Sequence, residues 1–191
     1  MSVSRKENLG PKAAAGNRQA LIAAAAEVFA ERGLDAPLSE VAKRAGVGQG
    51  SLYRHFPDRI SLALTAFEEN IAAVETLVAA DSTTLRDVLD LLTRQAIASV
   101  AFIQLVGPDD DDERIAAASQ RIRQALSGPL DTARAAGEVP PTLTVTELAL
   151  AVGMMAAYVA KRPPGDRRRS ADACWTLLSD AIGLKDTTTN P

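Results

Sequence analysis

The sequence predicts an all-α protein of about nine helices, and three observations support this expectation. Alanine and leucine, which are among the strongest helix formers, are abundant in the chain. Apolar residues recur three or four positions apart in one segment after another, which is the spacing of a helical face. The 191 residues contain no sustained alternation of Val, Ile or Thr with polar residues, the pattern typical of half-buried strands.

The expected helices are delimited by residues that start or stop helices. Asn17 is a candidate N-cap for the first helix and Gly33 its candidate stop. Pro37 suits the first turn of a short second helix ending at Ala45, and Asp58 is a candidate cap for a long fourth helix. We expect the third and later helices at 49–55, 59–80, 85–106, 113–136 with a candidate break at 127–129, from Thr144 or Thr146 to about 161, and from Asp166 to about 184.

Charge is distributed unevenly along the chain. The first 60 residues carry nine Lys or Arg against six Asp or Glu, whereas the remainder carries 12 against 18. A basic N-terminal part on an acidic body permits contact with nucleic acid, although the formal net charge is −3. The single cysteine, Cys174, excludes an internal disulfide and a cysteine-rich metal site. Since no segment has the apolar length of a signal peptide or a membrane span, we expect a cytoplasmic protein without a membrane partner.

The segment "AGVGQGSLYRHF" admits three interpretations. A phosphate-binding loop requires a Lys followed by Ser or Thr after the last glycine, and a strand before the first, and both are missing. A catalytic turn would use Ser51 and His55, but His55 is the only histidine and no strand-to-helix elbow is predicted. Two short helices joined by a glycine-containing turn, a helix-turn-helix, fit the spacing best.

A helical wheel separates the two sides of the third helix. Leu52 and Phe56 lie close together on it and form the edge expected to be buried. The opposite side is small, polar and cationic, with groups that hydrogen-bond to base edges or to phosphates. It consists of Gly50, Ser51 and Arg54, flanked by Tyr53 and His55, with Gln49 at the N-terminal end.

The runs "EVAKRAGV" and "GSLYRHF" resemble the TetR family of bacterial transcriptional regulators over residues 17–67. The resemblance implies a three-helix helix-turn-helix DNA-binding domain followed by a helical ligand-binding and dimerisation domain. It also implies a homodimeric regulator, most simply a repressor released from a palindromic operator by a small molecule. The corresponding domains are a flexible arm at 1–16, a DNA-binding domain at 17–60 with the helix-turn-helix at about 37–56, a ligand-binding and dimerisation domain at 61–184, and a flexible tail at 185–191.

The resemblance assigns DNA contacts to particular residues. Those implied to face the major groove are Gln49, Ser51, Tyr53 and Arg54, with Gly50 allowing close approach of the backbone. Those implied to hold phosphates are Tyr53, His55 and Arg59, together with Lys43 and Arg44 as weaker candidates. The basic residues of the N-terminal arm, which either contact the DNA backbone or minor groove or are simply solvated, are Arg5, Lys6 and Lys12.

The acidic body offers candidates for the dimer interface and for the ligand site. A helix over 147–160 is apolar on all sides, so it is either an internal core helix or part of a four-helix dimer interface with the last helix. The dimer-interface candidates are Leu148, Val152, Met155, Val159, Trp175, Leu178 and Ile182. The ligand-binding candidates, each of which can equally be ordinary core or surface, are Gln95, Ser99, Phe102, Met154 and Tyr158.

Other functional classes are weighed against the regulator. An enzyme requires a convergent acid-base or metal set, and the sequence offers one His, one Cys and scattered acids, so we expect no catalysis and no cofactor. The acidic run at 109–113 lacks the spaced ligands of a known cation loop, and we expect no metal there. A helical module whose head binds protein instead of DNA, and activation instead of repression, both stay open.

Overall fold

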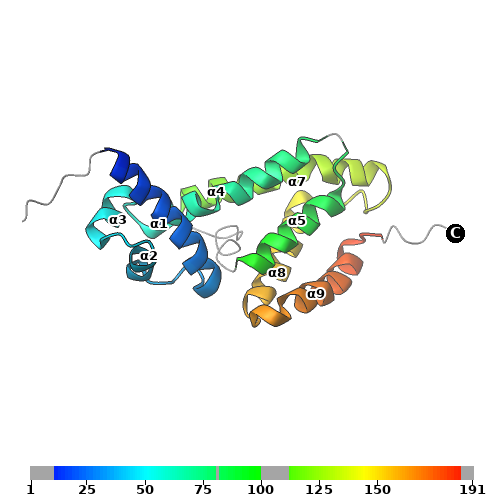
Figure 1. Cartoon of the computed structure of the whole chain (residues 1–191). Coiled ribbons are helices and arrows are strands. Elements are labelled where there is room, and N and C mark those ends of the chain that lie inside the picture. Colours follow the sequence, from blue (N-terminus) through cyan, green and yellow to red (C-terminus); the bar gives the residue numbers. More distant parts are fainter. Residues whose placement is uncertain (1–10, 81, 100–111, 186–191) are drawn as a thin grey trace, which may run out of the picture.

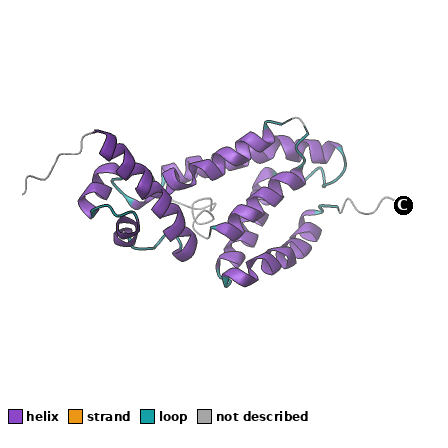
Figure 2. Ribbon diagram, viewed as in Figure 1, coloured by secondary structure: helices purple, strands orange, loops and turns teal. Residues whose placement is uncertain are grey.

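The computed structural model describes residues 11–80, 82–99 and 112–185, and within these ranges every regular element is a helix (Figure 2). This confirms the all-α class. Three helices make up the N-terminal part: α1 (Pro11–Arg32), α2 (Leu38–Arg44) and α3 (Gln49–His55). The remaining helices are α4 (Arg59–Val78), α5 (Leu85–Ala98), α7 (Glu113–Ala135), α8 (Val145–Ala160) and α9 (Arg167–Ile182), with a short 3-10 turn (Pro164–Asp166) before α9.

The helices form two parts that we call the head (α1–α3) and the body (α4–α9). The head lies at one end of the molecule, and α4 runs from it into the body (Figure 1). Helix α7 runs alongside α4, and α5, α8 and α9 complete the body on the other side (Figure 1). None of the described helices is long and apolar enough to cross a bilayer.

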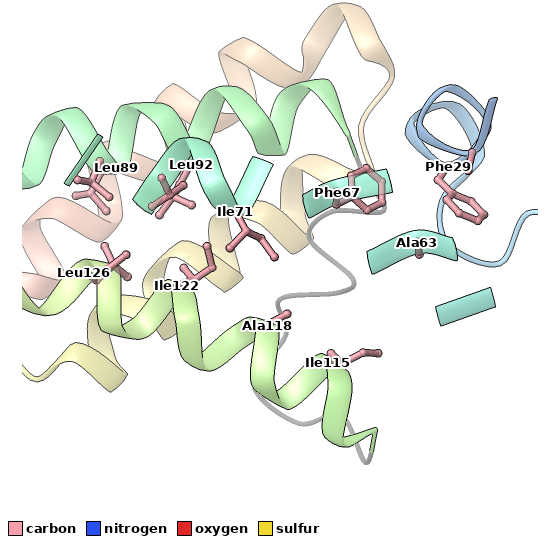
Figure 3. Packing of buried hydrophobic residues seen from close by; sticks show 14 of the residues in the cluster. Phe29, Ala63, Phe67, Ile71, Leu89, Leu92, Ile115, Ala118, Ile122 and Leu126 are labelled. Atoms are coloured by element: carbon pink, nitrogen blue, oxygen red, sulfur yellow. The ribbon is translucent and has the colours of Figure 1, made fainter. Parts of the chain in front are cut away.

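The larger of two apolar clusters among the described residues continues from the head into the body through α4. Phe29 of α1 lies near Ala63 and Phe67, which belong to the first half of α4 (Figure 3). Farther along α4, Ile71 faces Ile122 of α7, and both are almost fully buried (Figure 3). Because buried aliphatic and aromatic side chains supply most of the favourable free energy of folding, this core fixes the position of α4 against both parts.

Most helix starts and ends agree with the sequence expectations. Helix α3 occupies 49–55 as expected, and the Asp58 carboxylate accepts from the Ser61 N–H as the N-cap of α4. Thr144 caps α8 through a capping box with Glu147. Asp166 precedes α9 without a side-chain cap bond.

Two expectations about helix bounds are wrong. Helix α1 begins at Pro11, six residues before Asn17, so part of the expected flexible arm at 1–16 is helical. Proline is tolerated at a first helical position, and the alanines that follow it favour the helix. Helix α7 continues through the expected break, because Pro129 and Leu130 pack into the core. Helix α5 ends at Ala98; residues 100–106 of the expected helix, like 1–10 and 186–191, lie outside the described residues.

Candidate nucleic-acid interface

The turn between α2 and α3 depends on one glycine. Gly46 has φ +66°, a left-handed conformation that glycine adopts without the steric cost of a Cβ atom. The Gly46 and Val47 N–H groups donate back to the carbonyls of Lys43 and Ala42, which closes the end of α2. Gly48 is extended and its carbonyl accepts from the N–H groups of Ser51 and Leu52, which starts α3. The two helices are therefore joined by a turn of only a few residues.

Two apolar side chains hold α3 against the rest of the head. Leu52 is fully buried and Phe56, directly after the helix, is 2% exposed. They pack in the same core as Val41 of α2 and Phe29 of α1. Since Leu52 and Phe56 lie on one edge of α3, their burial turns the opposite side of the helix outward, as the wheel predicts.

The outward side of α3 carries polar groups that have no partner within the described part of the chain. Gln49, Tyr53 and Arg54 are exposed, with Tyr53 at 54%, and Ser51 and His55 are half-buried. No hydrogen bond or ion pair from another described residue reaches these five side chains. Their hydrogen-bonding capacity is thus available to a ligand outside the chain.

The cations of the head divide into paired and unpaired ones. Arg44 forms an ion pair of 2.9 Å with Glu31, which raises the pKa of Arg44 and lowers that of Glu31. Arg32 pairs with Glu40. Arg18, Lys43 and Arg54, in contrast, have no hydrogen-bond or ion-pair partner among the described residues.

Arg59 has a role in the structure that the sequence did not indicate. Its half-buried guanidinium donates to the carbonyls of Leu34 and Ala36, each at 2.5 Å, in the segment between α1 and α2. Arg59 thus ties α4 to the head through one guanidinium nitrogen, and the phosphate contact assigned to it stays a prediction. Arg18 was not among the DNA-contact candidates expected from the sequence. Its guanidinium lies 5.3 Å from the centre of the Phe56 ring, beside the end of α3.

Three of the four dimer-interface candidates on α8 are buried within the chain. Leu148, Met155 and Val159 are fully buried in the core of this chain, so a second copy has no access to them. Val152 and Leu178 are half-buried, Ile182 is 9% exposed, and the Trp175 indole N–H donates to the Thr93 hydroxyl at 2.8 Å. This stripe of α8 is therefore corrected from a dimer interface to internal core, because α5 and α9 cover the side that was expected to be free.

The opposite stripe of α8 is the exposed one. Leu150, Met154 and Tyr158 are 50%, 55% and 44% exposed, and Leu177 of α9 is 74% exposed. An open groove of about 410 Å³ lies between α8, α9 and the segment at 140–143, with Leu150 and Met154 on its wall. Met154 and Tyr158, which were expected in a ligand site, belong to this apolar surface.

The other ligand candidates have different positions. Gln95 of α5 and Ser99, directly after it, are 7% and 6% exposed, and Phe102 lies outside the described residues. The Gln95 side-chain N–H donates to the Asn70 carbonyl of α4 at 2.9 Å, while its buried oxygen accepts no hydrogen bond from the residues that the structure describes. Such a buried unsatisfied acceptor costs free energy, which a donor on a bound molecule can recover. Among the described residues, no cluster of His, Cys, Asp or Glu suits a metal ion.

Comparison with known proteins identifies similar sequences and folds. The family model "Bacterial regulatory proteins, tetR family" matches residues 21–66, which include α2 and α3. The crystal structure of TetR transcriptional regulator SCO0520 from Streptomyces coelicolor is 33% identical, with a TM-score of 0.56, and the match covers 90% of this chain and 99% of that one. The similarity therefore extends over the head and the body.

Two curated relatives match a part of the chain. The HTH-type transcriptional activator FasR of Mycolicibacterium smegmatis is 34% identical over 99 residues, 51% of this chain and 44% of FasR. The HTH-type transcriptional repressor BepR of Brucella suis is 44% identical over 50 residues, 26% of this chain and 24% of BepR. The matched part of the chain thus spans less than half the length of either relative.

Proposed function

The chain belongs to the TetR family of bacterial regulatory proteins, and from this premise we propose that it is a homodimeric, ligand-responsive regulator of transcription. The observation that carries the proposal is the outward side of α3, whose polar side chains have no partner among the described residues. Solvated polar groups on a helix that projects from a rigid core are suited to entering the major groove. We assign DNA binding to residues 17–60, and ligand binding and dimerisation to 61–184.

The contacts divide by chemistry. Gln49 and Arg54 have the planar donor groups that pair in bidentate fashion with adenine and guanine, and Tyr53 lies between them. Ser51, His55, Lys43 and Arg18 supply donors to phosphate oxygens, while Gly50 leaves no Cβ atom on the outer side of the helix. Arg44 is the weakest candidate, since its charge is already neutralised by Glu31.

The homodimer follows from the exposed apolar surface of the body. One head alone makes few contacts, so a two-fold operator with two half-sites requires two heads held at a fixed distance. Leu150, Met154, Tyr158 and Leu177 form an exposed apolar surface over two adjacent helices. We place the dimer interface there, in place of the buried stripe of α8, because apolar side chains in the centre of an interface favour association.

Regulation by a small molecule is assigned to the interior of the body. Gln95 bridges α5 and α4, and its buried oxygen has no donor within the described part of the chain, which supports an amphipathic ligand with an N–H or O–H group. Such a ligand changes DNA binding only if its affinity differs between the DNA-binding form of the protein and another form. We propose that the chain represses transcription. Of the two relatives, BepR is named a repressor and FasR an activator.

The test uses the full chain and a pool of random double-stranded DNA. We expect selection to enrich a palindrome, and fluorescence anisotropy to show affinity that falls steeply with salt as phosphate contacts displace counterions. Lys161→Ala, which removes an exposed lysine of the body, is the control and should bind as the wild type does. Selection without a consensus, or affinity that does not depend on salt, would contradict the proposal and favour a head that binds protein.

Ligand binding needs a separate experiment. A thermal-shift screen of amphipathic compounds should find molecules that raise the melting temperature, because binding to the native state stabilises it. Gln95→Leu removes the buried acceptor while keeping a side chain of similar size, and should weaken binding of those compounds that donate hydrogen bonds. Compounds that bind without changing affinity for the selected palindrome would contradict a regulatory role.

A further inference from the structure

The N-caps of α4 and α7 are joined by a single arginine. Asp58 caps α4 by accepting from the Ser61 N–H at 2.7 Å, and Asp112 caps α7 by accepting from the Arg114 N–H at 2.9 Å. The Arg114 guanidinium holds Asp112 through two nitrogens, at 3.0 and 2.8 Å. Its third nitrogen reaches both Asp58 oxygens, at 2.9 and 3.2 Å. The start of α4 is therefore tied to the start of α7, 56 residues away.

Asp58 and Arg59 are neighbours in the chain and connect in opposite directions. Asp58 binds Arg114 of the body, whereas Arg59 donates to the carbonyls of Leu34 and Ala36 in the head. The point where the chain leaves the head is thus held from both sides. A shift of α7 along α4 would act on Asp58 and, through Arg59, on the loop that precedes α2.

We propose that Arg114 is a positioning residue for DNA recognition, which holds the start of α4 against α7 and so sets the direction in which the head projects from the body. This rests on the proposed function, since the direction of the head matters only when two heads share one operator. The half-sites of such an operator are about 34–36 Å apart, one helical turn of DNA. Without this contact each head would sample several directions, and the dimer would discriminate less between operators of different half-site spacing.

The energetics favour positioning over general stability. Arg114 and Asp58 are 44% and 45% exposed, and exposed ion pairs contribute little to the free energy of unfolding. A guanidinium held by two carboxylates is nevertheless confined in direction, because its planar donors fix the geometry. The hydrogen bond from the Ser61 N–H, together with Arg114, keeps the pKa of Asp58 below its ordinary value, and Arg114 lowers that of Asp112 to about 2, so both carboxylates are charged at neutral pH.

The packing of α7 does not depend on this joint. Ile115 and Ile122 of α7 are buried against α4, and Arg121 binds Glu68 and Glu75 farther along α4, at 2.9 and 2.7 Å. Loss of the Arg114 side chain should therefore release the start of α4 while the body stays folded. This allows the joint to be tested in the whole protein.

The experiment compares binding to the selected palindrome with binding to derivatives whose half-sites are one or two base pairs closer or farther apart. In Arg114→Ala, the preference for the native spacing should fall about two- to thirtyfold, the usual range for coupling through a network of contacts. Affinity for an isolated half-site should not change. Arg114→Lys keeps a cation near Asp58 and should restore part of the preference. Such a rescue would show that the charge of Arg114 matters and not only the volume of its side chain.

Two further variants make the test specific. Asp58→Asn keeps a good N-cap but removes the charge, so it should reproduce the effect of Arg114→Ala, and the double variant should add nothing. Arg123→Ala is the matched control, because Arg123 lies on α7 and its side chain bonds only to Gln120 of the same helix among the described residues. Circular dichroism and thermal melting establish that each variant is folded.

The outcomes separate this proposal from the function on which it rests. A wild-type protein that binds no DNA would overturn the proposed function, and the positioning role with it. A wild-type protein that prefers one spacing, with Arg114→Ala and Asp58→Asn showing the same preference, would overturn the positioning role alone. The same holds if both variants lose affinity for the isolated half-site to the same degree as for the palindrome.

Discussion

The head and the body leave different kinds of surface unpartnered. In the head, Arg54 and Lys43 are exposed cations that pair with no described residue. In the body, Arg114 and Arg121 are each held by two carboxylates, and α8 and α9 expose the apolar side chains of Leu150, Met154, Tyr158 and Leu177. The head therefore offers unpaired positive charge to an anionic partner, and the body offers exposed apolar side chains to an apolar one.

This difference shows that net charge is a poor guide to the partner of a protein. The chain is formally negative, at −3, because of the acids of the body. Many of these acids are paired with arginines of the body, whereas the head keeps cations without such pairs. What a partner meets is the local surface, since charges beyond about 10 Å are screened at moderate salt.

The largest expected effect comes from the apolar surface of the body. Met154→Arg places a charge in the middle of that surface and should convert the dimer to a monomer in light scattering after size exclusion. Operator affinity should then fall by about a hundredfold or more, because the second head no longer benefits from effective concentration. Thr132→Arg adds the same charge to an exposed position of α7 and should leave the dimer intact. A wild-type monomer at micromolar concentration would contradict the interface.

The next effect concerns the recognition helix. Arg54→Ala removes an unpaired guanidinium and should cost about 1–3 kcal/mol in operator binding, with relaxed selection at one base position. Repeating the selection from random DNA measures this directly. Arg32→Ala is the control in the head, because Arg32 is engaged with Glu40. Equal losses in the two variants would mean that the difference between paired and unpaired cations has no functional meaning.

A smaller effect separates two neighbouring cations of α2. Lys43→Ala should reduce the slope of log affinity against log salt by about one, as expected for one lost phosphate contact. Arg44→Ala should change the slope much less, since Glu31 already neutralises Arg44. Anisotropy titrations at four or five salt concentrations distinguish the two. A larger change for Arg44 than for Lys43 would reverse this assignment.

The smallest effect is the pH dependence of the paired carboxylates. The pKa values of Asp58, Glu75 and Asp112 are lowered in the folded protein, that of Asp112 from 3.8 to about 2. The stability they contribute is therefore complete above the unfolded values near pH 4 and is lost as pH falls through the folded values. The difference in melting temperature between wild type and Arg114→Ala should be constant at pH 5–7 and shrink toward pH 2. A difference that grows on acidification would contradict this.

Local sequence was sufficient for much of the fold and of the head. The bounds of α3, the cap at Asp58 and the turn at Gly46 depend on residues within one helical turn of each other, so the pattern alone predicts them. The same is true of which edge of α3 is buried, because its apolar residues lie on one side only. Where a single side of a helix is apolar, amphipathicity decides its orientation.

The start of α1 and the continuity of α7 show where local rules compete. Gly16 and Asn17 suggest a boundary, but the helix extends back to Pro11 through a run of alanines. Pro129 suggests a break, yet it is buried within α7, and the packing of its neighbours outweighs the hydrogen bond lost at the proline. Propensity is a weak guide at such points, since tertiary contacts override it.

The sequence by itself determined the helical class, the head and the outward side of α3, because these depend on residues close together in the chain. Only the tertiary structure decided which side of α8 is exposed, since that helix is apolar all round and its neighbours α5 and α9 choose the buried side. It likewise decided that Arg59 ties α4 to the head and that Arg114 meets Asp58. Such pairs join residues 23 to 56 positions apart, a distance at which no periodicity in the sequence carries information.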